Sequence, residues 1–236
     1  MLHPAPSPAV STPPLDVDAD LLRRLAGRFL VFDGPDGSGK TTQFRVLADA
    51  ARAAGVGVLE IREPGGTPIG EEIRDLLLDV RTDDTADMDV VCEALLFMAS
   101  RAQLVTEQIR PALAAGRLVL ADRFVSSTFA YQGAAGGIPM ADLQHLARIT
   151  LRGCAPDLVL LMDVDRATSA ARLNPLMLDR IEARDTAFQE RVRDGFLAQA
   201  AADPQRFRVL DAGRSPGAVT AAMAEALEAW LAGQAP

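Results

Sequence analysis

A short glycine-rich segment carries the clearest chemistry of the chain. Residues 34–41 read Gly-Pro-Asp-Gly-Ser-Gly-Lys-Thr and fit the pattern G-x-x-x-x-G-K-[ST], in which backbone N–H groups surround nucleotide phosphates. Lys40, the single lysine among 24 basic residues, would reach the terminal phosphates, and the Thr41 hydroxyl suits Mg²⁺. The segment predicts a nucleoside triphosphate site made of Gly34, Pro35, Asp36, Gly37, Ser38, Gly39, Lys40, Thr41 and Thr42.

The elements predicted around this segment place it at one edge of a parallel sheet. An apolar run at 29–32 predicts a buried strand that ends at the glycine-rich loop, and a helix should follow over about 40–54. Strands that alternate with helices indicate an α/β fold with ligands at the carboxyl ends of the strands. The other strands are expected at 56–61, 118–121, 158–162 and 207–210, and the other helices at 93–115, 187–202 and 216–231.

Composition limits the function classes. The chain has 236 residues, 49% of them hydrophobic, so it can bury one core, and its net charge of −8 is the wrong sign for general binding to nucleic acid or anionic membranes. Cys92 and Cys154 lack zinc-site spacing, and no apolar run reaches the roughly 20 residues of a membrane span. We expect a cytoplasmic protein with a disordered, proline-rich tail at 1–20 and a single domain at 21–236.

Four further motifs occur in a distinctive order. They are REPGGTPIGEEIR at 62–74, LLFMASR at 95–101, DRFVSSTFAYQG at 122–133 and DRIEARDTAFQERVRDGF at 179–196. From about Arg28 onward the chain resembles the bacterial thymidylate kinases. The resemblance implies a P-loop NTPase-type three-layer sandwich, with a five-stranded parallel sheet and a mobile lid at about 166–182. It also implies a homodimer that uses Mg²⁺ and ATP to convert dTMP to dTDP, in dTTP biosynthesis.

The second substrate would bind through residues of these motifs. Phe97 and Arg101 are four apart and share a helix face, where a ring beside a guanidinium suits a pyrimidine; in the family the equivalents stack on thymine and bond its O4. Taken alone, Phe97 would be a core residue. The resemblance implies contacts to dTMP from Asp36, Glu63, Pro64, Arg74, Phe97, Arg101, Arg123, Ser127, Tyr131 and Gln132.

Each polar member of this set has an expected role and an alternative. Arg74 and Arg123 would hold the monophosphate, although each could form an ordinary ion pair. Gln132 would read the pyrimidine edge, although a loop glutamine is usually solvated, and Tyr131 would lie beside the deoxyribose or simply pack. Asp36 would bind the 3′-hydroxyl or stabilise an Asx turn.

Catalysis would depend on magnesium and on positive charge. Thr41, Asp122 and Glu63 are the predicted Mg²⁺ set, mostly through water, although Glu63 could be a solvated turn carboxylate. The resemblance assigns two lid arginines to the transferred phosphate. The predicted catalytic residues are Lys40, Asp122, Arg123, Arg172 and Arg180.

The chain departs from the family pattern at two places. Residues 173–178 contain no arginine or lysine, and Gly136 stands where relatives usually have arginine. These departures leave two alternatives open: a kinase for another or modified pyrimidine deoxynucleotide, and a nucleotide-binding module with weakened catalysis. Arg184, Arg191 and Arg193 are expected on a solvated helix face, with Glu190 and Asp194 as partners.

Overall fold

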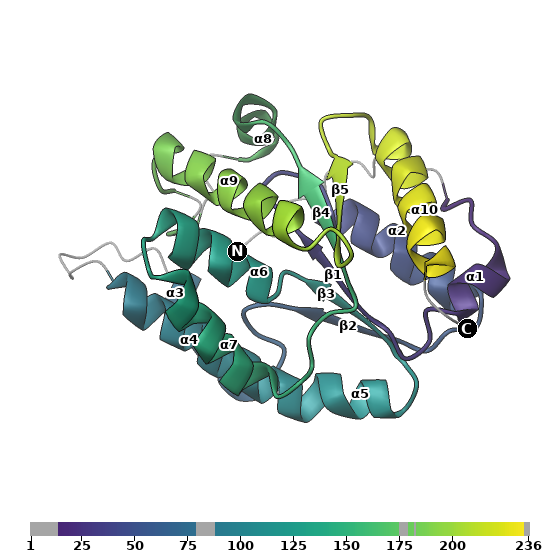
Figure 1. Cartoon of the computed structure of the whole chain (residues 1–236), viewed down its shortest axis with the longest axis horizontal. Helices are drawn as coiled ribbons and strands as arrows, with labels where there is room; N and C mark the ends of the chain where they lie inside the picture. Colours follow the sequence, from purple (N-terminus) through teal and green to yellow (C-terminus); the bar gives the residue numbers. More distant parts are fainter. Residues whose placement is uncertain (1–13, 79–87, 175–178, 182, 234–236) are drawn as a thin grey trace, which may run out of the picture.

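The computed structural model describes residues 14–78, 88–174, 179–181 and 183–233. Its centre is a five-stranded, fully parallel sheet in the order β2-β3-β1-β4-β5 (Figure 1). This confirms the predicted α/β class and the parallel sheet. The strands are β1 (Phe29–Asp33), β2 (Val58–Arg62), β3 (Leu118–Asp122), β4 (Leu158–Asp163) and β5 (Phe207–Asp211).

Helices cover both faces of the sheet (Figure 1). Alternation along β1 sends Leu30 and Phe32 toward α2 and α10, whereas Phe29 and Val31 face α4, α5 and α7. The helices are α1 (Ala19–Arg23), α2 (Lys40–Ala53), α3 (Pro68–Leu78), α4 (Val90–Leu104), α5 (Arg110–Ala114), α6 (Val125–Thr128), α7 (Met140–Leu151), α8 (Arg166–Arg172), α9 (Thr186–Ala202) and α10 (Pro216–Ala232), with two π-helical segments, η1 (Val105–Ile109) and η2 (Phe129–Ala135).

The helix predicted over 93–115 is built from three consecutive segments. It runs through α4, η1 and α5, and Pro111 lies in the first turn of α5. Proline lacks an N–H, so a change of hydrogen-bonding pattern just before it lets the chain stay helical.

The N-terminal boundary predicted at residue 20 was too late. Leu15 is buried in the cluster that also holds Leu22, and α1 begins at Ala19 and packs on α2. The expected tail at 1–13 lies outside the described residues, as do 175–178 and 182 of the predicted lid. Within the described ranges, none of the helices is both long and apolar enough to cross a membrane.

Candidate active site

The glycine-rich segment forms a loop between β1 and α2. Gly39 precedes α2 with a φ of 86°, a left-handed conformation that glycine adopts without strain. The Lys40 ammonium group donates to the carbonyl oxygens of Gly34 at 3.1 Å and Pro35 at 2.8 Å. Burial lowers the pKa of Lys40 to about 8; the charge of Arg123 adds to this effect and Asp36 opposes it.

Two oxygen-bearing side chains meet beside this loop. The Thr41 hydroxyl lies 3.3 Å from a carboxylate oxygen of Asp122, at the end of β3. Hydroxyl and carboxylate oxygens are the ligands that Mg²⁺ prefers, so both residues fit the ion. Among the described residues, no group of three or more His, Cys, Asp or Glu could hold a metal.

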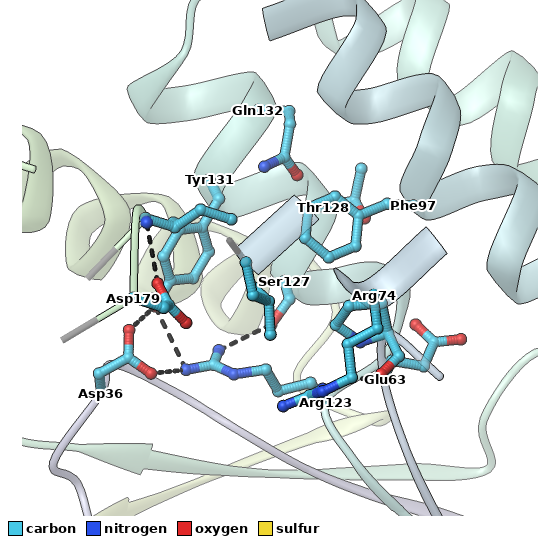
Figure 2. Close-up of a pocket in the computed structure, with 13 residues that line it drawn as sticks. Asp36, Glu63, Arg74, Phe97, Arg123, Ser127, Thr128, Tyr131, Gln132 and Asp179 are labelled. Atoms are coloured by element: carbon cyan, nitrogen blue, oxygen red, sulfur yellow. Dashed lines mark hydrogen bonds and ion pairs between the residues drawn. The ribbon is translucent and has the colours of Figure 1, made fainter. Parts of the chain in front are cut away.

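A cavity adjoins the loop at the carboxyl edge of the sheet. Figure 2 shows Phe97 and Gln132 toward one end of it and Asp36 and Arg123 toward the other. Every residue predicted for the acceptor nucleotide lines this cavity except Arg101. The lining consists of Asp36, Glu63, Pro64, Arg74, Leu78, Phe97, Arg123, Ser127, Thr128, Tyr131, Gln132, Asp179 and Ile181.

Arg123 organises the charged end of the cavity. Its guanidinium pairs with Asp36 and donates to the Ser127 hydroxyl at 2.9 Å, while the Tyr131 hydroxyl donates to Asp36 at 2.7 Å. Burial alone would raise the pKa of Asp36, but Arg123, Lys40 and the Tyr131 hydrogen bond together lower it. Asp36 is therefore an anion that already has cationic and hydroxyl partners.

The backbone at Arg123 is strained. Its φ of 68° lies in the left-handed region, which is unfavourable for a residue with a Cβ and recurs at functional sites. The Arg123 N–H donates to the carbonyl oxygen of Phe32 at 2.9 Å, so pairing with the neighbouring β1 holds this conformation.

Asp33 is a site residue that the sequence analysis missed. It is fully buried at the end of β1 and accepts hydrogen bonds of 2.6 Å from both Ser126 and Ser127. This links the start of the phosphate loop to α6. The signal in the sequence was a carboxylate that ends an apolar strand, just before the glycine-rich loop.

Glu63 and Arg101 form a buried ion pair. Arg101 is 1% exposed, and its Nε donates to the two Glu63 carboxylate oxygens at 2.8 and 3.1 Å. Burial raises the pKa of Glu63, and this effect outweighs the lowering by the Arg101 guanidinium, so that the pKa is about 7. The contact of Arg101 with a base and the role of Glu63 at a metal stay predictions.

The arginines expected on phosphates have separate locations. Arg74 lines the cavity and donates to the Pro64 carbonyl oxygen at 2.8 Å. Arg172 donates to Ala212 at 2.9 Å and to Gly37 of the phosphate loop at 3.4 Å. Arg172 therefore lies where a loop-bound phosphate could be reached.

Arg180 is bonded to Glu93, and its expected role at the transferred phosphate stays a prediction. Its guanidinium donates to the carboxylate of Glu93 at 2.6 Å and to the Leu77 carbonyl oxygen at 3.2 Å. Arg184 donates to the same Glu93 oxygen at 2.6 Å, so the expectation of a solvated face was wrong for this residue. A fully buried carboxylate requires compensating charge, which explains both positions.

Arg193 also differs from expectation, because it binds Asp163 through two hydrogen bonds of 2.6 and 2.8 Å. Several further residues of the site were missed, among them three polar ones. Asp179 and Thr128 line the cavity, and Glu93 lies behind Gln132, to which it is bonded at 2.7 Å. Glu93 is four residues before Phe97, on the same helix face, and it is the single acid in the apolar stretch 90–98. An isolated acid in an apolar helix could have identified Glu93 as a candidate site residue from the sequence.

Gly136, where the chain departs from the family pattern, has a steric explanation. A Cβ at this position would lie 2.7 Å from the Gln132 carbonyl oxygen and 2.7 Å from a methyl group of Val90. The end of η2 therefore folds back onto Gln132 too closely for a side chain. The glycine keeps Gln132 tightly packed.

Comparison with known proteins agrees with this arrangement. The family model described as thymidylate kinase matches residues 32–223. A thymidylate kinase of Exiguobacterium sibiricum is 45% identical over 192 residues, covering 81% of this chain and 89% of its own. One of Pelotomaculum thermopropionicum is 43% identical over 215 residues, covering 89% of this chain and 98% of its own.

A solved structure is similar as well. The crystal structure of thymidylate kinase from Ehrlichia chaffeensis superposes with a TM-score of 0.65 at 34% identity, covering 79% of this chain and 93% of that one. The match to the family model, over residues 32–223, spans the phosphate loop and every residue that lines the cavity. The chain belongs to the thymidylate kinase family.

Proposed function

We propose that this protein transfers the γ-phosphate of ATP to dTMP, giving ADP and dTDP. The observation that carries this proposal is one continuous cavity, with an aromatic ring and an amide toward one end and arginines with a carboxylate toward the phosphate loop. Two buried hydroxyls lack a hydrogen-bond partner among the described residues, namely Ser38 in the loop and Thr128 in the cavity wall. Each needs a partner that a bound nucleotide supplies.

The reaction is a direct displacement. A dTMP phosphate oxygen attacks the γ-phosphorus, the bond from that phosphorus to the bridging oxygen breaks, and its electron pair leaves with ADP. The attacking oxygen is already anionic, so no general base is needed. Lys40 binds the donor phosphates, Arg74 and Arg123 hold the acceptor phosphate, and Arg172 adds charge at the loop. Thr41 and Asp122 would hold Mg²⁺, mostly through water, and the ion would supply charge neutralisation at the phosphates.

The donor base has a separate hollow beside α2. Its wall includes Met162 and Val219 with the guanidinium-bearing Arg172 and Arg214, a combination that suits the flat face of adenine.

The proposal also includes the oligomeric state and the location of the protein. Exposed Ile69 and Leu76 on α3 and Val91 and Leu95 on α4 offer an apolar surface for a second copy, in a cytoplasmic homodimer.

The decisive experiment offers purified protein, Mg²⁺ and ATP with dTMP, dUMP, dCMP, dGMP and AMP in separate reactions. Product formation should be fastest with dTMP. Preference for another monophosphate would overturn the acceptor assignment. Binding of ATP and dTMP without turnover would overturn the activity.

Replacement of Phe97 by alanine should raise the KM for dTMP by about 10- to 100-fold, because base–aromatic stacking contributes about 1–3 kcal/mol. The KM for ATP should change by less than about twofold. Steady-state kinetics with each substrate varied in turn measures both. Phe97→Leu is the matched control, since it keeps apolar volume without a ring. If Leu restores the dTMP KM fully, Phe97 only packs.

Lys40 should titrate below the range of an ordinary lysine. Because its pKa in the free protein is lowered to about 8, the ammonium form is lost as the pH rises through 8. Bound ATP is an anion beside it and should raise the pKa, so ATP affinity should weaken above pH 8, by at most about tenfold per pH unit. Lysine-selective ¹³C labelling yields one side-chain signal from a tag-free chain. A free-protein midpoint near 10.5 would contradict this prediction.

A further inference from the structure

Glu93 of α4 connects the cavity wall to the segment around Arg180 and Arg184. Its side chain is fully buried. One carboxylate oxygen accepts a hydrogen bond from the Gln132 side-chain amide at 2.7 Å, and the other accepts from Arg180 and Arg184, each at 2.6 Å. The partners lie 39, 87 and 91 residues away in the chain. None of the predicted catalytic steps uses this carboxylate.

The hydrogen bond between Glu93 and Gln132 fixes the orientation of the Gln132 side-chain amide. Both Glu93 carboxylate oxygens accept hydrogen bonds, one from Gln132 and the other from two guanidinium groups, so the amide nitrogen of Gln132 faces Glu93. The amide oxygen is then free to face the cavity that Gln132 lines. Gln132 is itself 1% exposed, so the close packing around its side chain restricts other rotamers.

This orientation distinguishes two pyrimidine edges. Thymine has a donor at N3 and an acceptor at O4, whereas cytosine has an acceptor at N3 and a donor at N4. An amide oxygen held toward the base accepts from thymine N3–H and repels cytosine N3. A ligand that leaves a buried polar group facing the wrong partner binds more weakly, and this gives discrimination of orders of magnitude against it.

We infer that Glu93 is a positioning residue that sets acceptor-base specificity through Gln132, and that its contacts with Arg180 and Arg184 link this specificity to the placement of these two arginines. The inference rests on the proposed function. Glu93 touches neither substrate in this scheme; it acts by fixing the amide that does. Arg180 and Arg184 supply positive charge beside the buried Glu93 carboxylate. They therefore stabilise the group that holds the Gln132 amide in the orientation that recognises the base.

The test compares dTMP with 5-methyl-dCMP, which keeps the methyl group and differs from dTMP at N3 and C4. In Glu93→Gln, the new amide can donate or accept a hydrogen bond, so the side-chain amide of Gln132 can flip and present its nitrogen to the base. The ratio of kcat/KM for dTMP over 5-methyl-dCMP should fall by about tenfold or more. The KM for dTMP should rise about tenfold, whereas kcat at saturation and the KM for ATP should change by less than about threefold.

Three variants make the test specific. Glu107→Gln makes the same change at an exposed position on η1 and should match wild type. Gln132→Leu removes the amide, and adding Glu93→Gln to it should cause no further loss of discrimination, because Glu93 acts through Gln132. Glu93→Asp keeps the charge but shortens the side chain. It should shift the ratio in the same direction even if Glu93→Gln fails to fold.

A ratio within about twofold of wild type in a folded Glu93 variant would overturn the inference, as would additive losses in the Gln132→Leu background. Thermal unfolding establishes which variants fold. The wild-type assay separates the two hypotheses: wild type inactive on dTMP refutes the proposed function, whereas active wild type with unchanged Glu93 variants refutes only the role of Glu93.

Discussion

Replacement of Lys40 by alanine is expected to lower kcat/KM for phosphoryl transfer by about 10³-fold or more. The ammonium group is the single lysine charge of the chain and lies at the phosphate loop, 7% exposed. Removing it takes away the cation that binds the donor phosphates in the proposed reaction. The measurement is product formation at saturating ATP and dTMP, followed by titration of each substrate.

The structure also predicts a small effect of Lys40→Ala on stability. Lys40 donates to two carbonyl oxygens of the loop, so its loss should cost about 1 kcal/mol of unfolding free energy and leave the fold intact. Arg45→Ala removes an exposed cation from the same helix and should be active and stable. Lys40→Arg should remain strongly impaired, because a planar guanidinium is wider than an ammonium group. Near-normal turnover in Lys40→Ala would contradict the assignment of Lys40 to the donor phosphates.

The fold and the phosphate loop were accessible from the sequence because their signals are local. Apolar runs that end in a charge or a glycine marked the strands, and the observed β1 and β3 extend the predictions by one residue each, to Asp33 and Asp122. The loop motif is contiguous, so its conformation depends on residues within a few positions of Lys40. The cavity lining was predicted largely through the family resemblance, since Phe97 alone reads as a core residue.

The ion pairs behind the cavity could not be predicted in the same way. Glu63 and Arg101 are 38 residues apart, and both bury fully only because β2 and α4 converge at the same edge of the sheet. Arg180 and Glu93 are 87 residues apart. Sequence patterns give the charge of an arginine but not which of several phosphates or carboxylates it will meet. That depends on how segments far apart in the chain pack together, as α4 does against the residues that follow β2 and the residues that precede α9.

Replacement of Arg123 by alanine is expected to lower both activity and stability strongly. The side chain holds the acceptor phosphate in the proposed reaction, so kcat/KM for dTMP should fall by about 10³-fold, with a smaller change in the KM for ATP. The change also leaves Asp36 in a mostly buried place without its ion-pair partner. Breaking such a pair should cost about 2–3 kcal/mol of unfolding free energy, measured by denaturant titration.

A second substitution separates these two roles of Arg123. Asp36→Asn added to Arg123→Ala removes the uncompensated anion, so most of the lost stability should return, while turnover should stay at the level of Arg123→Ala. Arg148→Ala, at an exposed position on α7, is the matched arginine control and should resemble wild type. If restored stability also restored turnover, Arg123 would act by holding Asp36 in place. Because the left-handed backbone of Arg123 directs its guanidinium to both Asp36 and the cavity, we expect stability alone to recover.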